Sequence, residues 1–401
     1  MENHKYMKYI KAAFFIGASL VLLFIILLLL TSCRSQQELD ELGIVAGVAV
    51  DTGRGTDPLS QGGTSVEITA QIVSFSSAKS TQGKDSGDGP SGAWNLKLQG
   101  ESVLEAIRSS LNVTNRHLYF SHNQVLIFGR DLAERGLRNH IDFFIRDYEA
   151  RMNVPLVIAD GRGSELLAVE PDNAILSAEF ISDLVSLQKK QGDCVDTRFF
   201  QFAQDLASWE KGTLVPIIGI DEQDDKKQLK IKGTAVMQKD TMVGELDAIA
   251  TRGVSWVLGT VKEGTVTVVT PQGLVTVEIT DAKVSREITF DQEGKMHVTI
   301  KIQQTGIIGH ATGGTGNGYE QNIDEIQKAV EKEIEKEIRA GKEKLVACCC
   351  DAYGFGDSLR RFQHKTWEEV QSRWEDIFET MVFHIEVHSN INNTGALEEN
   401  L

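Results

Sequence analysis

The residue with the clearest chemical role in this chain is a cysteine near its start. Cys33 follows Thr31-Ser32, and before these lies an apolar run over 12–30 that is preceded by three lysines. A basic leader, an apolar segment and small residues before a cleavage site are the three parts of a secretory signal. A cysteine directly after the cut supplies a thiol that a diacylglycerol donor can alkylate. We therefore predict a signal peptide over 1–32 and lipidation of Cys33, the first residue of the mature protein.

The alternative for this segment is an uncleaved signal anchor, because the apolar run is about long enough to cross a bilayer core. Lipidation also explains the cysteine after two small residues, which an anchor does not need. In both cases the chain after Ser32 lies outside the cytoplasmic membrane.

A second set of reactive side chains falls on the last predicted strand. His384, Glu386 and His388 alternate with apolar residues, so a strand places all three on one face within reach of a metal ion. A solvated polar face explains the same pattern, and no fourth ligand is visible nearby. The loop over 313–318 is rich in glycine but lacks a Gly-Lys-Ser/Thr ending, and Tyr319 stands where a dinucleotide-binding loop has its last glycine. We predict no metal and no phosphate-binding cofactor.

The remaining cysteines form neither a disulfide framework nor an active site. Cys194 stands alone, and Cys348, Cys349 and Cys350 are consecutive, which denies them the spacing of a zinc site. Burial as small apolar side chains is the simpler interpretation. No Gly-x-Ser-x-Gly nucleophile motif is present in the sequence. We predict that the protein is not an enzyme and holds no cofactor.

The composition limits the class of partner. With 41 basic and 57 acidic side chains, the chain has a formal net charge of −16, and no basic run could bind a phosphate backbone. We therefore expect no nucleic-acid partner. Anionic lipid headgroups repel the same acidic excess, so lipid bound through Cys33 is the only membrane contact that we predict. An apolar fraction of 41% suffices for real cores, and the length predicts about two domains after the leader.

Strands alternate with helices through the first half of the chain. Ser102 and Glu105 form a capping box for one helix, which has Leu111 on its inward stripe. A second helix, over 130–151, has Ile145 on its inward face. This alternation predicts a mixed sheet covered by helices. Strands are expected over 43–50, 66–75, 123–128, 154–159 and 214–220, and further helices near 179–190 and 199–210.

A charged run over 221–227 has no apolar member and predicts a linker or an exposed turn between two domains. The half that follows is rich in strands and ends in helices. Strands are expected over 230–238, 266–270, 274–279, 287–290, 296–303 and 381–387, and helices over 323–348 and 367–380. The predicted fold class is α+β, with mixed sheets flanked by helices in two or three consecutive small domains.

Several short motifs occur in the order found in one protein family, and together they cover nearly the whole chain after the leader. In the first half they are Cys33, Glu38-Leu39-Asp40-Glu41-Leu42-Gly43, Arg116-His117-Leu118, Ser121-His122, 132–136, Arg146-Asp147, Glu149 and Arg151. In the second half they are Gly233-Thr234-Ala235, Lys239-Asp240, Val243-Gly244, Trp256, Gly259, 351–356, Trp367, Trp374 and 391–395. In these motifs the chain resembles the spore germination Ger(x)C family, the C-subunit lipoproteins of nutrient germinant receptors.

The resemblance implies a function and an arrangement. It implies a lipoprotein on the outer face of the cytoplasmic membrane, which is the spore inner membrane, working with integral-membrane A and B subunits during germination. The domains would be 33–222 and 228–396, and the family's three-domain arrangement would divide the second near Lys283. The chain departs from the family at Arg34-Ser35, where a Trp-Asp pair is common.

The segment over 351–356 is the predicted partner-docking element. Phe355 stands between Gly354 and Gly356, which would expose its ring, and Asp351 opens the segment. The alternative is a turn whose ring fills the core. A substrate-binding lipoprotein of a transporter would use the same anchor and is the second candidate function, although the sequence shows no two similar lobes. A cell-envelope hydrolase is the third.

Overall fold

The computed structural model describes most of the chain after residue 41. The described residues are 16–17, 19, 42–53, 65–73, 92–146, 149–206, 208, 211–223, 226–271, 273–312 and 322–393. Cys33, nearly all of the predicted signal peptide and the loop over 313–318 lie outside them. No helix among the described residues has the length and apolar character needed to cross a membrane.

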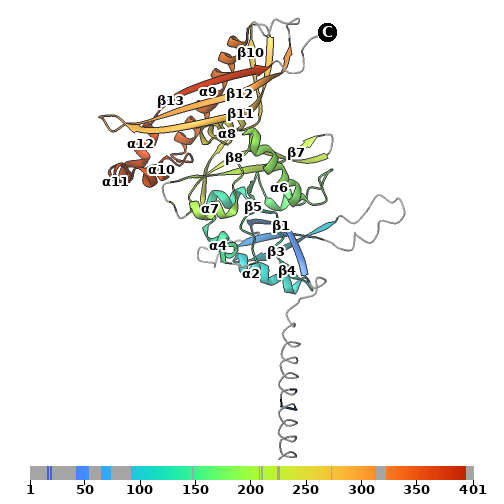
Figure 1. Cartoon of the computed structure of the whole chain (residues 1–401). Coiled ribbons are helices and arrows are strands. Elements are labelled where there is room, and N and C mark those ends of the chain that lie inside the picture. The colour runs from blue at the N-terminus through green and yellow to red at the C-terminus, as the bar shows by residue number, and fades with distance from the viewer. Residues whose placement is uncertain are drawn as a thin grey trace, which may run out of the picture.

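One large sheet forms the frame of the first half (Figure 1). Its strands are β1 (Leu42–Thr52), β2 (Val66–Val73), β3 (Ala93–Gly100), β4 (His117–Tyr119), β5 (Val125–Gly129), β6 (Leu156–Ala159), β7 (Thr213–Gln223), β8 (Lys226–Gln238) and β9 (Thr241–Leu246). The order is β3-β2-β1-β5-β6-β7-β8-β9, and β4 pairs with the start of β1. The central strands β1, β5, β6 and β7 are parallel, and antiparallel strands complete both edges.

Helices cover both faces of this sheet, because its central strands are apolar on both sides. One group consists of α2 (Val103–Arg108), α3 (Arg130–Arg135), α4 (Arg138–Arg146) and α7 (Phe199–Asp205), and the other of α5 (Gly163–Leu166) and α6 (Ser177–Gln188). In β1, Val48 and Val50 share a core cluster with the first group, and Ala46 and Ala49 share one with the second. The buried, unbroken apolar run of β1 therefore follows from its central position.

The helix predicted over 130–151 is in fact two helices, α3 and α4. Gly136 separates them with a φ of 114°, a positive value that residues with side chains rarely adopt. The interruption changes the phase of the second helix, so the prediction that Ile145 faces inward is wrong. Its side chain is 46% exposed.

The predicted cap of the preceding helix is present. The side-chain oxygen of Ser102 accepts a hydrogen bond from the N–H of Glu105 at 3.2 Å. The expected inward position of Leu111 is wrong, because α2 ends at Arg108 and a 3₁₀ turn over Ser109–Asn112 follows. Leu111 is 66% exposed.

A four-stranded sheet carries the second half of the chain. Its strands are β10 (Gly264–Thr270), β11 (Gly273–Phe290), β12 (Met296–Thr312) and β13 (Val382–Asn393), in that order, with β13 parallel to β12. The strands predicted over 274–279 and 287–290 are one strand, because β11 pairs with β12 along its whole length despite two irregularities. The inner face shares one core with α8 (Ala248–Leu258), α9 (Ile323–Ala347), α10 (Phe355–Phe362), α11 (His364–Val370) and α12 (Trp374–Thr380).

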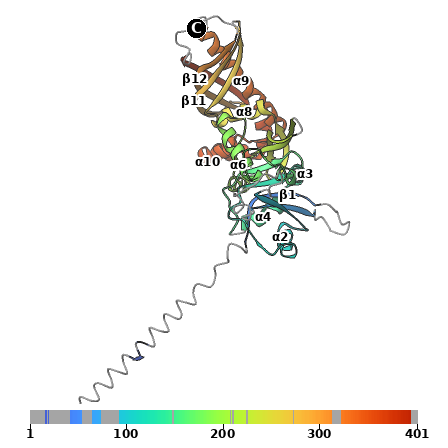
Figure 2. The same cartoon turned by 90° about the vertical axis from the view of Figure 1, so that its right-hand side faces the viewer.

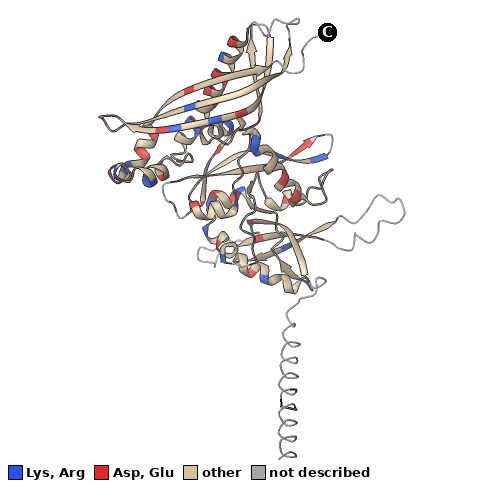
Figure 3. Ribbon diagram, viewed as in Figure 1, with Lys and Arg blue, Asp and Glu red and all other residues tan. Residues whose placement is uncertain are grey.

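The charged run over 221–227 lies at the tip of the β7–β8 hairpin. Asp221 pairs with Gln228 and Glu222 with Lys227, so the described residues of the run belong to paired strands and the large sheet continues across it. Leu214, at the start of β7 and far from the tip, belongs to the core of the second half. The two halves are stacked along the long axis of the molecule (Figures 1 and 2). Acidic and basic side chains are interspersed over both (Figure 3).

The suggested division near Lys283 is not seen in the fold. Lys283 lies within β11 and pairs with Gln303 of β12, and residues before and after it contribute to one core. The predicted fold class, α+β with mixed sheets flanked by helices, is confirmed as a two-domain arrangement. The limits 33–222 and 228–396 stay a prediction, since the large sheet includes strands from both ranges.

Candidate functional site

The predicted docking element over 351–356 is part of the core. Phe355 is 2% exposed and opens α10, where its ring packs at 5.0 Å from that of Tyr353 and at 6.1 Å from that of Phe383. A Cβ on Gly356 would lie 3.1 Å from the ring of Trp374, so the backbone is also closely covered. The expectation that Phe355 is exposed for docking is therefore corrected. Its flanking glycines allow close packing.

Asp351 is buried beside this ring and organises the start of α10. Its carboxylate accepts hydrogen bonds from the N–H groups of Phe355 at 3.1 Å and Gly356 at 2.8 Å. Burial raises the pKa of Asp351 to about 6, although these N–H bonds and that of Gly354 act in the opposite direction. The role of Asp351 in this arrangement is structural, because each of its carboxylate oxygens accepts a hydrogen bond from a backbone N–H at the start of α10.

The polar residues of β13 do lie on one exposed face, as predicted. Glu386 forms an ion pair with Lys301 at 3.0 Å. The Nε2 of His384 lies 2.9 Å from the Nδ1 of His297, whose other nitrogen lies 3.1 Å from a carboxylate oxygen of Asp291. This chain of contacts was not expected from the sequence. No group of three metal-ligating side chains is present within the described part of the chain.

The carboxyl edge of the parallel strands is where open α/β sheets usually bind ligands. Here it is filled by the protein's own charges. The Asp51 carboxylate accepts hydrogen bonds from the N–H groups of Gly163 at 2.7 Å and Ser164 at 2.9 Å. Burial raises the pKa of Glu67, but hydrogen bonds from Gln99 and Arg162 outweigh this effect and hold it below its usual value.

A second ion-pair group closes the rest of this edge. The guanidinium of Arg130 lies 2.9 Å from carboxylate oxygens of both Asp160 and Glu245. Arg130 follows β5, Asp160 follows β6 and Glu245 lies in β9, so the group ties the centre of the sheet to its edge. At the carboxyl edge the charged side chains are therefore paired with one another and connect neighbouring strands.

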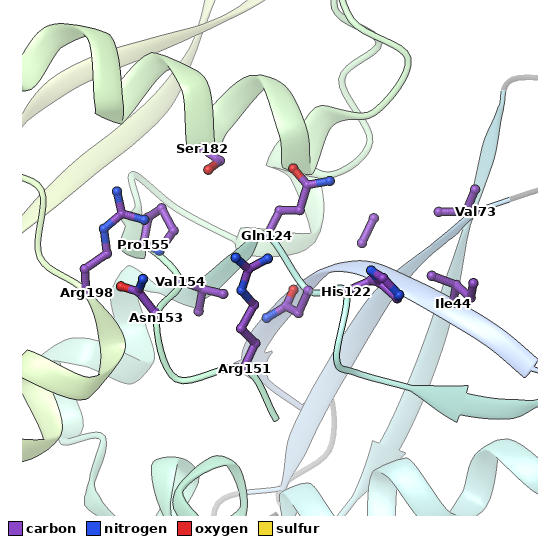
Figure 4. A pocket seen from close by; sticks show the side chains of 12 residues that line it. Ile44, Val73, His122, Gln124, Arg151, Asn153, Val154, Pro155, Ser182 and Arg198 are labelled. Atoms are coloured by element: carbon purple, nitrogen blue, oxygen red, sulfur yellow. The ribbon is translucent and has the colours of Figure 1, made fainter. Parts of the chain in front are cut away.

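The opposite, amino edge of the same strands is open. A cleft of about 460 Å³ lies there, between the starts of β1, β5 and β6 and the helices α6 and α7 (Figure 4). Its lining residues are Ile44, Ala46, Val73, His122, Asn123, Gln124, Arg151, Asn153, Val154, Pro155, Ser182 and Arg198. The cleft is a candidate site on the N-terminal half, and its residues come from six separate segments.

Backbone hydrogen bonds hold these segments in place. The N–H of Gln124 donates to the carbonyl of Ala46 at 2.8 Å, which joins the turn before β5 to β1. The N–H of Leu126 donates to the carbonyl of Pro155 at 3.0 Å, and the N–H of Phe199 donates to that of Val154 at 2.9 Å. Backbone hydrogen bonds therefore connect the floor of the cleft to the sheet.

The charge of the cleft contrasts with that of the chain. None of its lining residues is acidic, whereas it contains two arginines and a histidine. Arg198 is compensated by Asp196, at 2.8 Å, but Arg151 makes no hydrogen bond or ion pair with another described residue. Asn123 is 5% exposed, and its side-chain oxygen has no hydrogen-bond partner in the described part of the chain.

This cleft was not predicted from the sequence. His122 and Arg151 appeared only among the motifs of the resemblance, and no spacing rule connects them with Asn153, Ser182 or Arg198. They meet because β1, β5 and β6 are neighbours in the sheet. The order of strands is what creates the site.

Comparison with known proteins gives matches over almost all of the chain after residue 34. The model of the spore germination protein N-terminal domain matches 35–220, and that of the spore germination B3/GerAC-like C-terminal domain matches 232–395. Two similar proteins are spore germination proteins KC and B3 of Bacillus subtilis (strain 168). KC is 24% identical over 94% of this chain and 95% of its own length, and B3 is 22% identical over 94% and 97%.

The fold resembles that of a solved protein. The crystal structure of the GerBC protein matches with a TM-score of 0.57 and 18% sequence identity, and it covers 88% of this chain and 99% of that one. This similarity supports the assignment of the fold. The matched domain models carry the assignment of the family.

Proposed function

This chain belongs to the spore germination GerAC family, and from that premise we propose that it is the lipid-anchored C subunit of a nutrient germinant receptor. It acts without catalysis, by association with integral-membrane A and B subunits during germination. The observation that carries this proposal is the match of both family domains, in order, over nearly the whole chain after the leader. The signal-peptide pattern that precedes Cys33 supports a lipid anchor at this residue.

The position of the anchor supports association with membrane subunits. Leu42, where β1 begins, is nine positions after Cys33, so even a fully extended connection spans about 30 Å. Lipid at Cys33 therefore keeps the start of the large sheet near the membrane surface. A tether of this kind raises the effective concentration of the domain toward an integral-membrane partner without a large interface.

The anchor is tested by replacing the thiol. We expect Cys33→Ala to abolish the diacylglyceryl modification and to release the protein from the membrane fraction, because one thiol carries the attachment. Cys349→Ala is the matched control, since Cys349 is exposed on the second half and should not affect lipid labelling. Mass spectrometry of the N-terminal peptide is the measurement. A wild-type protein with an intact Met1 and no lipid mass on Cys33 would contradict the anchor.

The role in the receptor is tested in spores. We expect spores that lack the protein to lose their response to particular nutrients and to keep their response to chemical triggers that bypass receptors. The wild-type protein should also co-purify with a multi-spanning permease-like subunit and a second integral-membrane subunit. A normal response to every nutrient in a deletion strain without related genes, together with no co-purification, would contradict the proposal.

The alternative function, a substrate-binding lipoprotein of a transporter, predicts two similar lobes around a cleft. The two halves of this molecule differ in strand number and order, with nine strands in one sheet and four in the other. The cleft described above lies within one half. These observations favour the receptor subunit.

A further inference from the structure

We propose that the cleft at the amino edge of β1, β5 and β6 binds a small organic anion. Arg151 holds the anionic group, and a short apolar part of the ligand lies against Ile44 and Val73. This inference goes beyond the role of a receptor subunit and does not depend on it, because it rests on the cleft alone.

The charge of the cleft is unbalanced. The chain has a net charge of −16, yet the lining residues include no carboxylate. Asp196 already neutralises Arg198, which leaves Arg151 as a guanidinium without an acidic partner among the described residues. A guanidinium presents a planar fork of donors that fits a carboxylate or phosphate with two parallel hydrogen bonds. The charge therefore favours an anionic ligand and selects Arg151 as its main contact.

Neutral polar side chains lie around this arginine in the cleft. Figure 4 shows the side chain of Arg151 reaching into the middle of the cleft, with Gln124 and Ser182 on the far side of it. Asn123 also lines the cleft and is 5% exposed, and its side-chain oxygen has no hydrogen-bond partner in the described part of the chain. A buried polar atom without a hydrogen bond costs free energy, so small local movements that let it reach a ligand donor would be favourable. These amides and the hydroxyl suit a ligand with a second polar group.

One end of the cleft is apolar. Ile44, Ala46 and Val73 line the cleft, and Figure 4 shows Ile44 and Val73 on the side of His122, away from Asn153 and Arg198. The volume of about 460 Å³ lies in the range of sites for small molecules. A ligand with an anionic group at one end and a short aliphatic part at the other fits this distribution. It could be a free carboxylate or the headgroup region of an anionic lipid, since both carry this chemistry.

The test is a titration of the full chain in nanodiscs of zwitterionic lipid, followed by saturation-transfer NMR. Butyrate and butyramide are the probes, because they have nearly the same shape and differ in charge. We expect butyrate to bind at least tenfold more tightly than butyramide, as expected of a charge-assisted hydrogen-bond pair. Arg151→Gln should remove this difference, and Arg151→Lys should retain part of it. Arg135→Gln is the matched control, because Arg135 is exposed, paired with Asp131 and outside the cleft.

Competition identifies the source of the anion. If dihexanoyl-phosphatidylglycerol displaces butyrate at lower concentration than inorganic phosphate does, the site prefers a lipid headgroup. If the two compete equally or phosphate is the stronger, the site prefers a free anion. Equal binding of butyrate and butyramide, or an unchanged preference in Arg151→Gln with an unchanged melting temperature, would overturn the proposal. Arg151 is exposed, so its substitution should not unfold the protein.

Discussion

Phe355 and Phe362 stand two turns apart on α10 and have opposite environments. By helical period both belong to the face that also carries Leu359. Phe355 and Leu359 are buried, whereas Phe362 is 82% exposed, because the helix ends at Phe362, beyond the edge of the core. Residue type and spacing alone do not distinguish these two rings.

This difference predicts unequal effects of two identical substitutions. We expect Phe355→Ala to lower the free energy of unfolding by about 3 to 5 kcal/mol, as removal of a fully packed ring does. Phe362→Ala is the exposed control and should change it by less than about 0.5 kcal/mol. Urea unfolding of a fragment over 34–401, followed by tryptophan fluorescence, is the measurement. Similar losses in the two variants would contradict the burial described for Phe355.

Asp351 predicts a pH dependence of stability. Burial raises its pKa to about 6 in the folded protein, despite the N–H bonds that it accepts, whereas an unfolded aspartate has a pKa of about 3.9. A carboxyl whose pKa is raised by folding contributes stability while it is protonated, below about pH 4. That contribution is lost as the pH rises toward about 6.

The test of this pH dependence is Asp351→Asn, which keeps a neutral side chain at every pH. Between pH 4 and pH 7 the wild type should lose on the order of 2 to 3 kcal/mol relative to the variant, and the difference should be constant above that range. The test compares how the free energy of unfolding changes with pH in the two proteins. Its absolute value is not compared, because asparagine offers only one carbonyl oxygen to the two N–H groups and therefore lowers the stability at every pH. Parallel pH profiles would contradict the raised pKa.

At the scale of elements, α8 and α9 are held together by close backbone contact. A Cβ on Gly253 would lie 1.8 Å from the carbonyl oxygen of Glu337, so the two helices can approach only where a side chain is missing. Next to this contact the indole N–H of Trp256 donates to the carboxylate of Glu337 at 2.7 Å in a buried position. A Cβ on Gly341 of α9 would also lie only 2.9 Å from the carbonyl oxygen of Ala250 in α8. The helix pair therefore depends on small residues in both helices and on a buried hydrogen bond.

We expect Gly253→Ala to destabilise the protein by about 1 to 3 kcal/mol, because the added methyl group forces the helices apart. Gly309→Ala is the control in β12, where the nearest atoms to a new Cβ are 3.8 Å away. It should change the stability by less than about 0.5 kcal/mol. Thermal unfolding by circular dichroism measures both. Equal melting temperatures for the two variants would show that α8 and α9 are not closely packed.

At the scale of the whole molecule, the large sheet joins the two halves. β8 and β9 follow the charged run over 221–227 in sequence, yet they complete the sheet of the first half by pairing with β7. The N–H of Leu137 donates to the carbonyl of Asp240, which ties the start of α4 to the β8–β9 turn. A cut at the charged run would leave β7 as an unprotected edge.

This arrangement predicts the behaviour of two fragments. A fragment over 34–246, which keeps β8 and β9, should be soluble and unfold cooperatively. A fragment over 34–222 lacks both strands and should aggregate or be digested rapidly, because the edge of β7 and the apolar surface beside it are uncovered. Gel filtration and limited proteolysis compare them. A compact, protease-resistant fragment over 34–222 would show that the first half is complete without these strands.

The sequence by itself determined the features that depend on neighbouring residues. Apolar runs located β1, β2, β5, β6 and β7 to within a few residues, and the Ser102 cap and the helix over 323–348 were predicted correctly. The α+β class followed from the alternation of these elements. The motif order implied the family that the domain matches then showed. These signals act over one or two turns of helix or one strand, so the local sequence contains them.

Only the tertiary structure decided where side chains of the same kind end up. It buried Phe355 and exposed Phe362, carried the large sheet across the charged run, and brought His122, Arg151 and Arg198 to one cleft. Each of these outcomes depends on the order of strands and on contacts between residues far apart in the chain. Local periodicity contains no information about strand order, because any of several orders would bury the same apolar faces.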